Sequence, residues 1–161
     1  MIDQLQQAVA AREDGRDDEA YELLMVLHEK HPSDPQVNLQ CAWINDKRGD
    51  EARAVPYYEA AVAGGLQSGD LQHALLGLGS TYRTLGRYRE SLEVLDRGVT
   101  EFPDDNGMKV FRAMSLYNSG RAKDACELLL EILATTDQEV SIGRYQSAIA
   151  TYAADLDRTW S

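Results

Sequence analysis

Long apolar runs are missing from this sequence. No stretch of its 161 residues approaches the roughly 20 consecutive apolar residues that a membrane-spanning helix needs. The first residues, MIDQLQQAVAAREDG, lack a basic stretch followed by an apolar block, so they do not resemble a secretory signal. We therefore expect a cytoplasmic protein that does not associate with membranes.

Cysteine is scarce as well, with only Cys41 and Cys126 in the chain. Two thiols are too few for the disulfide framework of a small secreted domain, and their separation does not match the spacing of metal ligands. Both are therefore expected to be buried as small apolar side chains.

Positive charge is also in short supply. The chain carries 16 Lys and Arg against 27 Asp and Glu, which gives a net charge of -11 at pH 7. The basic residues are scattered, so no basic stripe is available to neutralise phosphates or to bind an anionic membrane. Nucleic acids and membranes are therefore not expected as partners.

The residue patterns of enzymes are absent in any convincing form. The three histidines are His28, His31 and His73, and none is placed with a nucleophile in a recognisable arrangement. The stretch HEKH puts the first two imidazoles on one helical face, but no third ligand clusters with them, so we expect neither a metal nor another cofactor. The stretch GLG at 77–79 belongs to a helical pattern rather than to a phosphate-binding loop. An enzyme that uses His28 and His31 is an alternative only if a metal binds there.

What the sequence does contain is an internal repeat. A glycine followed by a charged turn and a small residue recurs as GRDDEA, GDEARA, GRYRES and GRAKDA, beginning at Gly15, Gly49, Gly86 and Gly120. The intervals are 34, 37 and 34 residues. Five positions after each glycine stands a small side chain, which is Ala20, Ala54, Ser91 or Ala125. The same structural unit is therefore predicted to occur four times.

Each repeat is predicted to be a helical hairpin. Apolar residues have helical spacing on both sides of Gly86. They are Leu75, Leu78, Tyr82 and Leu85 before it, and Tyr88, Leu92, Leu95 and Val99 after it. A glycine between two helices can adopt the left-handed conformation that ends the first helix and turns the chain into the second. Inside a helix a glycine costs about 1 kcal/mol relative to Ala, so Gly79 and Gly98 are expected where two backbones approach closely.

The third unit resembles the tetratricopeptide repeat. The residues that fall on the 34-residue pattern of this family are Leu75, Leu78, Gly79, Tyr82, Gly86, Tyr88, Ser91, Leu95, Gly98 and Pro103. The other units keep parts of the same pattern. The resemblance implies an all-α, right-handed α-solenoid of four helical hairpins in a single domain. The hairpins are expected at about 1–34, 35–68, 72–105 and 106–137.

The ends of the array and one connection are expected to depart from this pattern. The first helix carries Gln4 and Gln7 where the family has bulky apolar residues, as expected for a terminal repeat without a neighbour. A capping helix is expected over 138–158. Its apolar face would contain Ile142, Tyr145, Ile149, Tyr152 and Leu156. The stretch AGGLQSGDL, at 63–71, is predicted to be a longer loop between the second and third repeats.

In the family, the first helix of each repeat lines a concave groove that binds peptides. The matching positions here are Leu5, Val9, Arg12, Leu39, Trp43, Asp46, Lys47, Leu76, Ser80, Arg83, Val110, Met114 and Tyr117. The resemblance makes Trp43, Met114 and Tyr117 candidate anchors, with Arg12 and Arg83 at the edges of the groove together with Lys47.

The resemblance therefore predicts a non-enzymatic adaptor that binds a protein or peptide segment in this groove. Two other interpretations stay open for the groove residues. Trp43 could pack against a neighbouring helix while Met114 fills a gap in the core, or the C-terminal helix could fold back into the groove. The alternative function is self-association, in which the groove or the C-terminal helix pairs with another copy of the chain.

Overall fold

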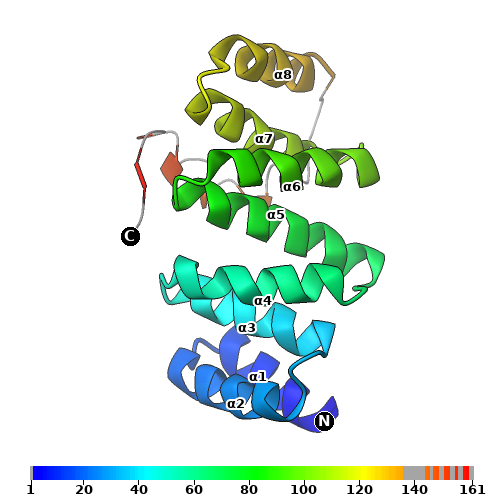
Figure 1. Cartoon of the computed structure of the whole chain (residues 1–161), viewed down its shortest axis with the longest axis vertical. Coiled ribbons are helices and arrows are strands. Elements are labelled where there is room, and N and C mark those ends of the chain that lie inside the picture. The colour runs from blue at the N-terminus through cyan, green and yellow to red at the C-terminus, as the bar shows by residue number, and fades with distance from the viewer. Residues whose placement is uncertain are drawn as a thin grey trace. The chain divides into compact units, whose positions relative to one another are not determined.

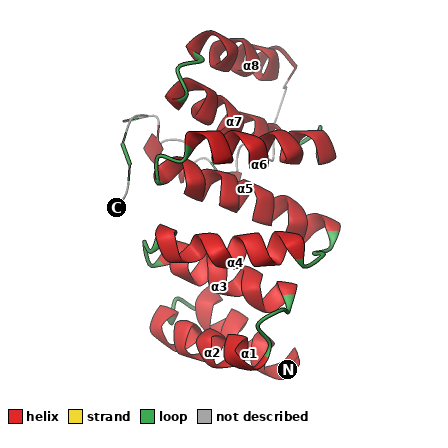
Figure 2. Cartoon of the chain, viewed as in Figure 1, coloured by secondary structure: helices red, strands yellow, loops and turns green. Residues whose placement is uncertain are grey.

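The structure is a computed structural model that describes residues 2–135 and, beyond them, residues 144–145, 147–148, 151–152, 155 and 158–159. Its helices are α1 (Ile2–Glu13), α2 (Asp17–Lys30), α3 (Pro35–Lys47), α4 (Glu51–Ala63), α5 (Ser68–Thr84), α6 (Tyr88–Glu101), α7 (Asn106–Asn118) and α8 (Ala122–Thr135). The described residues contain helices and turns but no strand (Figures 1 and 2), which confirms the all-α fold class. None of the described helices is both long and apolar enough to span a membrane.

The chain forms two compact units, residues 1–81 and 82–161, and the boundary falls near the end of α5. In the first unit α1 packs on α2, α2 on α3 and α3 on α4. In the second unit α6 packs on α7, and α7 packs on α8. Figure 1 shows α3 beside α4 and α7 beside α8, so the hairpin is the building block of both units.

All four recurring glycines end a helix in the left-handed conformation, as predicted for Gly86. The φ angles are 77°, 75°, 74° and 78° at Gly15, Gly49, Gly86 and Gly120. After each glycine, the N–H of the next residue donates to the carbonyl oxygen five residues earlier, at 2.8 or 2.9 Å. This bond satisfies a carbonyl that the end of the helix would otherwise leave without a partner.

Aspartates begin two of the hairpins. The Asp34 carboxylate accepts hydrogen bonds from the backbone N–H groups of Gln36 and Val37, both at 2.9 Å. The Asp105 carboxylate accepts one from the N–H of Met108 at 2.9 Å. Such caps satisfy N–H groups at the start of a helix and fix the residue at which α3 and α7 begin.

The core of the first unit lies between its first two hairpins. Leu24 and Leu27 of α2 are buried in one cluster with Val37, Cys41 and Ile44 of α3. The Cys41 Sγ lies 3.7 Å from the carbonyl oxygen of Leu24. Burial raises the pKa of the Cys41 thiol to about 12. This cysteine is therefore a neutral core side chain at physiological pH, as the sequence predicts.

A tyrosine of α4 fits against a glycine of α5. Tyr58 is buried, and its hydroxyl donates to Oδ2 of Asp46 at 2.6 Å. A Cβ atom on Gly77 would lie 2.5 Å from the Tyr58 hydroxyl oxygen and 2.7 Å from its Cζ. The ring can reach Asp46 only because residue 77 has no side chain.

The second unit shows the close helix approach that the sequence predicts at Gly98. A Cβ atom at this position would lie 2.8 Å from Sδ of the buried Met108. The same pair of helices, α6 and α7, is joined by a buried 2.7 Å hydrogen bond between the hydroxyls of Ser91 and Ser115. The neighbouring buried cluster contains Ala113, Leu116 and Ala125, with Leu92 and Leu128 packed against it.

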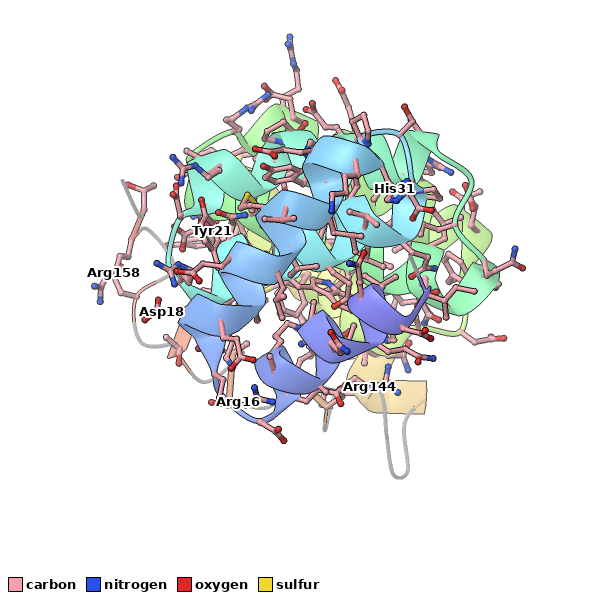
Figure 3. All side chains as sticks on the ribbon, turned by 90° about the horizontal axis from the view of Figure 1, so that it is seen from below. Arg16, Asp18, Tyr21, His31, Arg144 and Arg158 are labelled. Carbon is pink, nitrogen blue, oxygen red and sulfur yellow. The ribbon has the colours of Figure 1, made fainter. Side chains whose placement is uncertain are left out.

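Charged side chains join the first two hairpins at the surface of the first unit. Lys47 Nζ donates to Oδ1 of Asp17 at 2.6 Å. Arg48 pairs with Asp18, and its Cζ lies 4.8 Å from the centre of the Tyr21 ring. Figure 3 shows Asp18 and Tyr21 near the N-terminal end of α2. Exposed ion pairs of this kind contribute only about 0–1 kcal/mol each, so they assist rather than determine the packing.

Some sequence-based predictions need correction. Cys126 is exposed, not buried, because it lies on a side of α8 that no described helix covers. The predicted loop at 63–71 is shorter, since α4 extends to Ala63 and α5 already begins at Ser68. Most of the expected helix over 138–158 lies outside the described residues.

The contact between Gly77 and Tyr58 predicts the effect of Gly77→Ala. The added Cβ would displace the Tyr58 ring, which should lower the free energy of unfolding by about 1–3 kcal/mol. The higher helix propensity of Ala raises it by about 1 kcal/mol, so the net effect should still be a loss of stability. The control is Gly69→Ala in the same helix, where a Cβ meets nothing within 4 Å. Urea unfolding of both variants checks this, and a Gly77→Ala protein as stable as Gly69→Ala would contradict the steric argument.

Candidate functional site

Three side chains of the first unit form a ladder across α1, α3 and α5, the first helices of successive hairpins. The Arg12 Cζ lies 5.2 Å from the centre of the Trp43 ring. The Trp43 and His73 rings meet edge to face, with centroids 6.4 Å apart. All three side chains are partly exposed. We call Arg12, Trp43 and His73 the ladder.

Neighbouring polar groups fix the position of Arg12. Its Nε donates to Oε1 of Gln40 at 3.2 Å. Lys47 Nζ donates to the backbone carbonyl of Arg12 at 3.1 Å and to Asp17 at 2.6 Å. The guanidinium therefore lies over Trp43 in a defined orientation, and the cation–π contact stabilises this arrangement by about 0.5–1 kcal/mol at an exposed site.

The remaining predicted groove residues of the first unit lie at different depths. Leu39 is completely buried and Leu76 is 5% exposed, so these two support the surface from beneath. Leu5 and Val9 are partly exposed on α1. Lys47 is exposed, and Arg12 and Trp43 are accessible beside it. The surface available to a partner is thus narrower and more polar than the sequence suggests.

A partly buried carboxylate, Asp46, lies on α3 close to Trp43 and Lys47 in the sequence. Asp46 accepts hydrogen bonds from the hydroxyls of Tyr58 at 2.6 Å and Thr81 at 3.1 Å. Desolvation raises the pKa of Asp46 to about 6, with a further rise from the charge of Glu51, while the two hydroxyl donors act in the opposite direction. Asp46 consequently joins α3, α4 and α5 through a group that titrates near neutral pH.

In the second unit the predicted groove residues are mostly buried. Arg83, expected at an edge, is 1% exposed, and its Nη1 donates to Oδ1 of Asn118 at 3.2 Å. Val110 is 7% and Met114 8% exposed, whereas Tyr117 is 38% exposed. Tyr117 is the candidate anchor of this unit that a partner can reach.

Two tyrosines from the C-terminal part of the chain contact residues of α5 and α7. The Tyr152 ring lies 4.3 Å from the Arg83 Cζ. Phe111 of α7 meets Tyr145 and Tyr152 edge to face, with centroids 5.5 and 6.1 Å away. Two tyrosines that the sequence assigns to a capping helix therefore contact side chains on the first helices of the third and fourth repeats.

Sequence reasoning missed several of these residues as members of a site. The groove residues predicted from the sequence do not include His73, Gln40 or Phe111. His73 lies three positions before the predicted groove residue Leu76, so helical spacing places it on the same face of α5 and is the signal that could have identified it. The repeat register does not identify Phe111, whose contacts depend on the C-terminal tyrosines.

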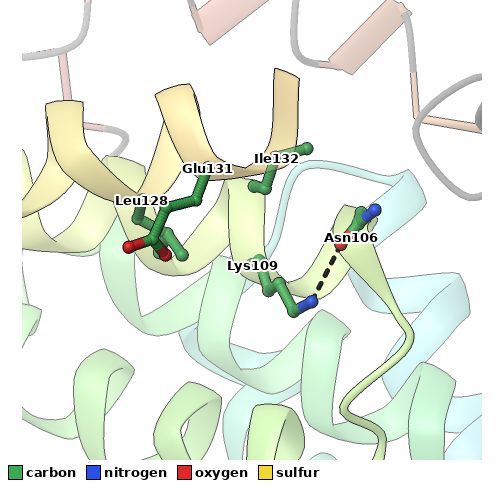
Figure 4. Close-up of a pocket in the computed structure, with 5 residues that line it drawn as sticks. All are labelled: Asn106, Lys109, Leu128, Glu131 and Ile132. Atoms are coloured by element: carbon green, nitrogen blue, oxygen red, sulfur yellow. Dashed lines mark hydrogen bonds between the residues drawn. The ribbon is translucent and has the colours of Figure 1, made fainter. Parts of the chain in front are cut away.

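The second unit also has a small pocket, which Figure 4 shows between α7 and α8. It is lined by Asn106, Lys109, Leu128, Glu131 and Ile132, and its volume is about 200 Å³. Small-molecule sites usually enclose about 300–1,000 Å³. Within the described residues, no group of three or more His, Cys, Asp or Glu side chains is placed to hold a metal ion.

Two family models match the chain. Tetratrico peptide repeat covers residues 35–156, which is more than half of the sequence, and Tetratricopeptide repeat covers residues 4–34. The chain therefore belongs to the tetratricopeptide repeat family, whose fold is a non-catalytic scaffold for protein interactions. No curated protein matches the sequence.

Solved structures share the same fold at low sequence identity. MamA AMB-1 is 18% identical, with a TM-score of 0.75 over 88% of this chain and 76% of that one. MamA MSR-1 is 20% identical, with a TM-score of 0.70 over 98% of each chain. YrrB, a TPR protein with an unusual peptide-binding site, is 19% identical, with a TM-score of 0.73 over 96% of this chain and 77% of that one. These proteins support the α-solenoid fold class.

The raised pKa of Asp46 predicts a pH-dependent stability. Native Asp46 keeps its proton up to about pH 6, whereas the unfolded side chain loses it near the ordinary value of 3.8. The native state binds more protons between these values, so the free energy of unfolding falls as pH rises through this window and is then constant. Asp46→Asn should remove this pH dependence, so the stability of the variant relative to the wild type should rise by about 3 kcal/mol between pH 4 and pH 7.

Urea unfolding across that pH range measures the difference. Thr81→Val provides the second test, because it removes a donor to the carboxylate and should extend the window to higher pH. An Asp46→Asn stability that parallels the wild type at every pH would show that Asp46 titrates normally.

Proposed function

We propose that the ladder is a binding site for an extended protein or peptide segment. Trp43 offers an apolar ring, and Arg12 offers a guanidinium that is already oriented by Gln40 and the ring itself. Trp and Arg are the residues that most often dominate binding energy, particularly where they are held rigidly before the partner arrives. The single observation that carries the proposal is the stack of Arg12 on Trp43.

The setting of the ladder also favours a peptide over a small molecule. Its side chains come from the first helices of three successive hairpins, so a ligand must extend along the array to touch all three. An apolar or aromatic side chain would contact Trp43, while a carbonyl or carboxylate of the same segment would accept from Arg12. The fold shared with YrrB, whose peptide-binding site is described as unusual, agrees with this proposal.

Selection from a phage-displayed random peptide library against the immobilised protein tests this proposal. The affinity of the selected peptide should fall about 30-fold in Trp43→Ala, which corresponds to about 2 kcal/mol. Arg12→Ala should also weaken binding. Val26→Ala, a change at an exposed residue of α2, is the matched control and should leave the affinity unchanged.

Thermal melts establish that each variant is folded, and Arg12→Ala keeps the test decisive if Trp43→Ala is unstable. A selected peptide that binds Trp43→Ala and Arg12→Ala as tightly as the wild type would show that the ladder is not its site.

A second candidate function is self-association through α8. This helix exposes Leu130 to 64% and Leu133 to 72%, and Leu129 and Cys126 are exposed beside them. These residues form one apolar helical face, because their spacing is three or four positions.

The repeat register shows what such a face does elsewhere in the chain. Leu129 occupies the position in its repeat that Leu24 has in the first repeat, and Leu24 is completely buried against α3. The α8 face is therefore a stacking surface that no following repeat covers within the described residues.

A second copy of the chain can cover the apolar face of α8 in two ways, with its own α8 face or with its α1. The positions of α1 that correspond to the stacking residues of α3 are Asp3, Gln7 and Ala10, all exposed. Packing this polar surface on the leucines of α8 would leave polar groups buried without partners. An isologous dimer, in which α8 packs on α8 of another copy, buries leucine against leucine instead.

Light scattering over a dilution series tests the dimer. Wild-type protein should show a mass that rises towards twice 17.9 kDa with concentration. Leu133→Glu should remain a monomer, because the charge would be buried in the interface. Ile2→Glu, which alters an equally exposed apolar residue of α1, should behave as the wild type. A monomeric wild-type protein at every concentration, or a dimer that Leu133→Glu does not weaken, would eliminate this interface.

A further inference from the structure

Arg83 is a charged side chain with unmet hydrogen-bonding capacity. Only 1% of its surface is exposed, and Nη1 donates to Asn118. Nε and Nη2 are buried, and no acceptor in the described part of the chain lies within hydrogen-bonding distance of them. A buried donor without a partner destabilises a structure by about 1–3 kcal/mol, and more if it is charged. Such a group indicates a site at which an acceptor would be favourable.

Burial of the Arg83 guanidinium lowers its pKa, while the neighbouring Tyr152 acts in the opposite direction. An arginine remains protonated even so, so the positive charge persists beneath its cover. A ligand carboxylate could accept from two donors of the guanidinium at once, in the bidentate geometry that arginine favours.

The cover of Arg83 is aromatic: the Tyr152 hydroxyl hydrogen-bonds with the guanidinium, but neither covering tyrosine supplies a carboxylate. The Tyr152 ring lies over the guanidinium, and Phe111 holds both Tyr152 and Tyr145 by edge-to-face contacts. Cation–π and aromatic contacts contribute about 0.5–2 kcal/mol each. Each of these ring contacts is weak enough for a ligand that makes a stronger contact to replace it.

We propose that Arg83, Phe111 and Asn118 form a second peptide-binding site, which the chain's own Tyr145 and Tyr152 cover. The partner that fits this site is a segment with a carboxylate next to an aromatic side chain. Its carboxylate accepts from Arg83 Nε and Nη2, and its ring takes the place of a tyrosine against Phe111. The C-terminal segment is thus an internal competitor, and the site does not depend on the ladder of the first unit.

The covered site predicts a specific pattern of affinities. The probes are a fluorescent peptide of alternating Glu and Tyr and a neutral control peptide of alternating Gln and Tyr. In the full-length chain, Tyr145→Ala/Tyr152→Ala should bind the acidic peptide about tenfold more tightly than the wild type, because the site no longer has to be uncovered first. Tyr145→Phe/Tyr152→Phe keeps both rings and removes only the hydroxyls, so its affinity should stay much closer to that of the wild type than to that of the double-alanine variant.

Two further substitutions identify the site. In the double-alanine background, Arg83→Gln should abolish the preference for the acidic peptide over the neutral one. The gain in affinity of the double-alanine variant over the chain that keeps both tyrosines should persist when both proteins also carry Trp43→Ala, so this comparison does not depend on whether the ladder itself binds peptides.

Hydrogen exchange on the wild-type chain gives a test without substitutions. A saturating concentration of the acidic peptide should increase amide exchange of Tyr145 and Tyr152, because the ligand displaces them. Equal affinities of the wild-type and double-alanine proteins, an unaltered preference after Arg83→Gln, or unchanged exchange at the two tyrosines would overturn the proposal.

Discussion

The reversal of the backbone at four glycines is the constraint on which the rest of this structure depends. Each of these residues has a φ near +75°, and the amide after each glycine satisfies a carbonyl at the end of the preceding helix. A side chain with a Cβ would strain this conformation. The glycines therefore fix where each hairpin turns, and the turn determines which residues of the next helix face their neighbours.

The ladder, the proposed peptide-binding site of the first unit, follows from that register. Arg12, Trp43 and His73 come from three different helices, yet they meet because the hairpins between them reverse at equivalent points. Asp46 contributes in a different way, since its two hydroxyl partners join three helices. Two of the helices that carry the ladder, α3 and α5, are therefore joined through a carboxylate whose pKa is raised to about 6.

The sequence predicts the backbone better than it predicts the surface. Glycine spacing and helical apolar periodicity locate the hairpins, and Gly98 is correctly expected at a close helix contact. Exposure is harder to predict, because it depends on what covers a helix from a distant part of the chain. Arg83 has the repeat position of a groove residue but is buried beside Tyr152. Cys126 is a residue type usually found in the core, but it is exposed on a face of α8 that no described helix covers.

Among the described elements, α1 and α8 differ in the polarity of their outer residues. The outer positions of α1 are Asp3, Gln7 and Ala10, whereas α8 exposes Leu130 and Leu133. A designed hairpin joined in register after α8 would meet an apolar stacking surface, but the same hairpin placed before α1 would meet polar side chains. Lengthening of this protein by repeat duplication is therefore physically favoured from its C-terminal side.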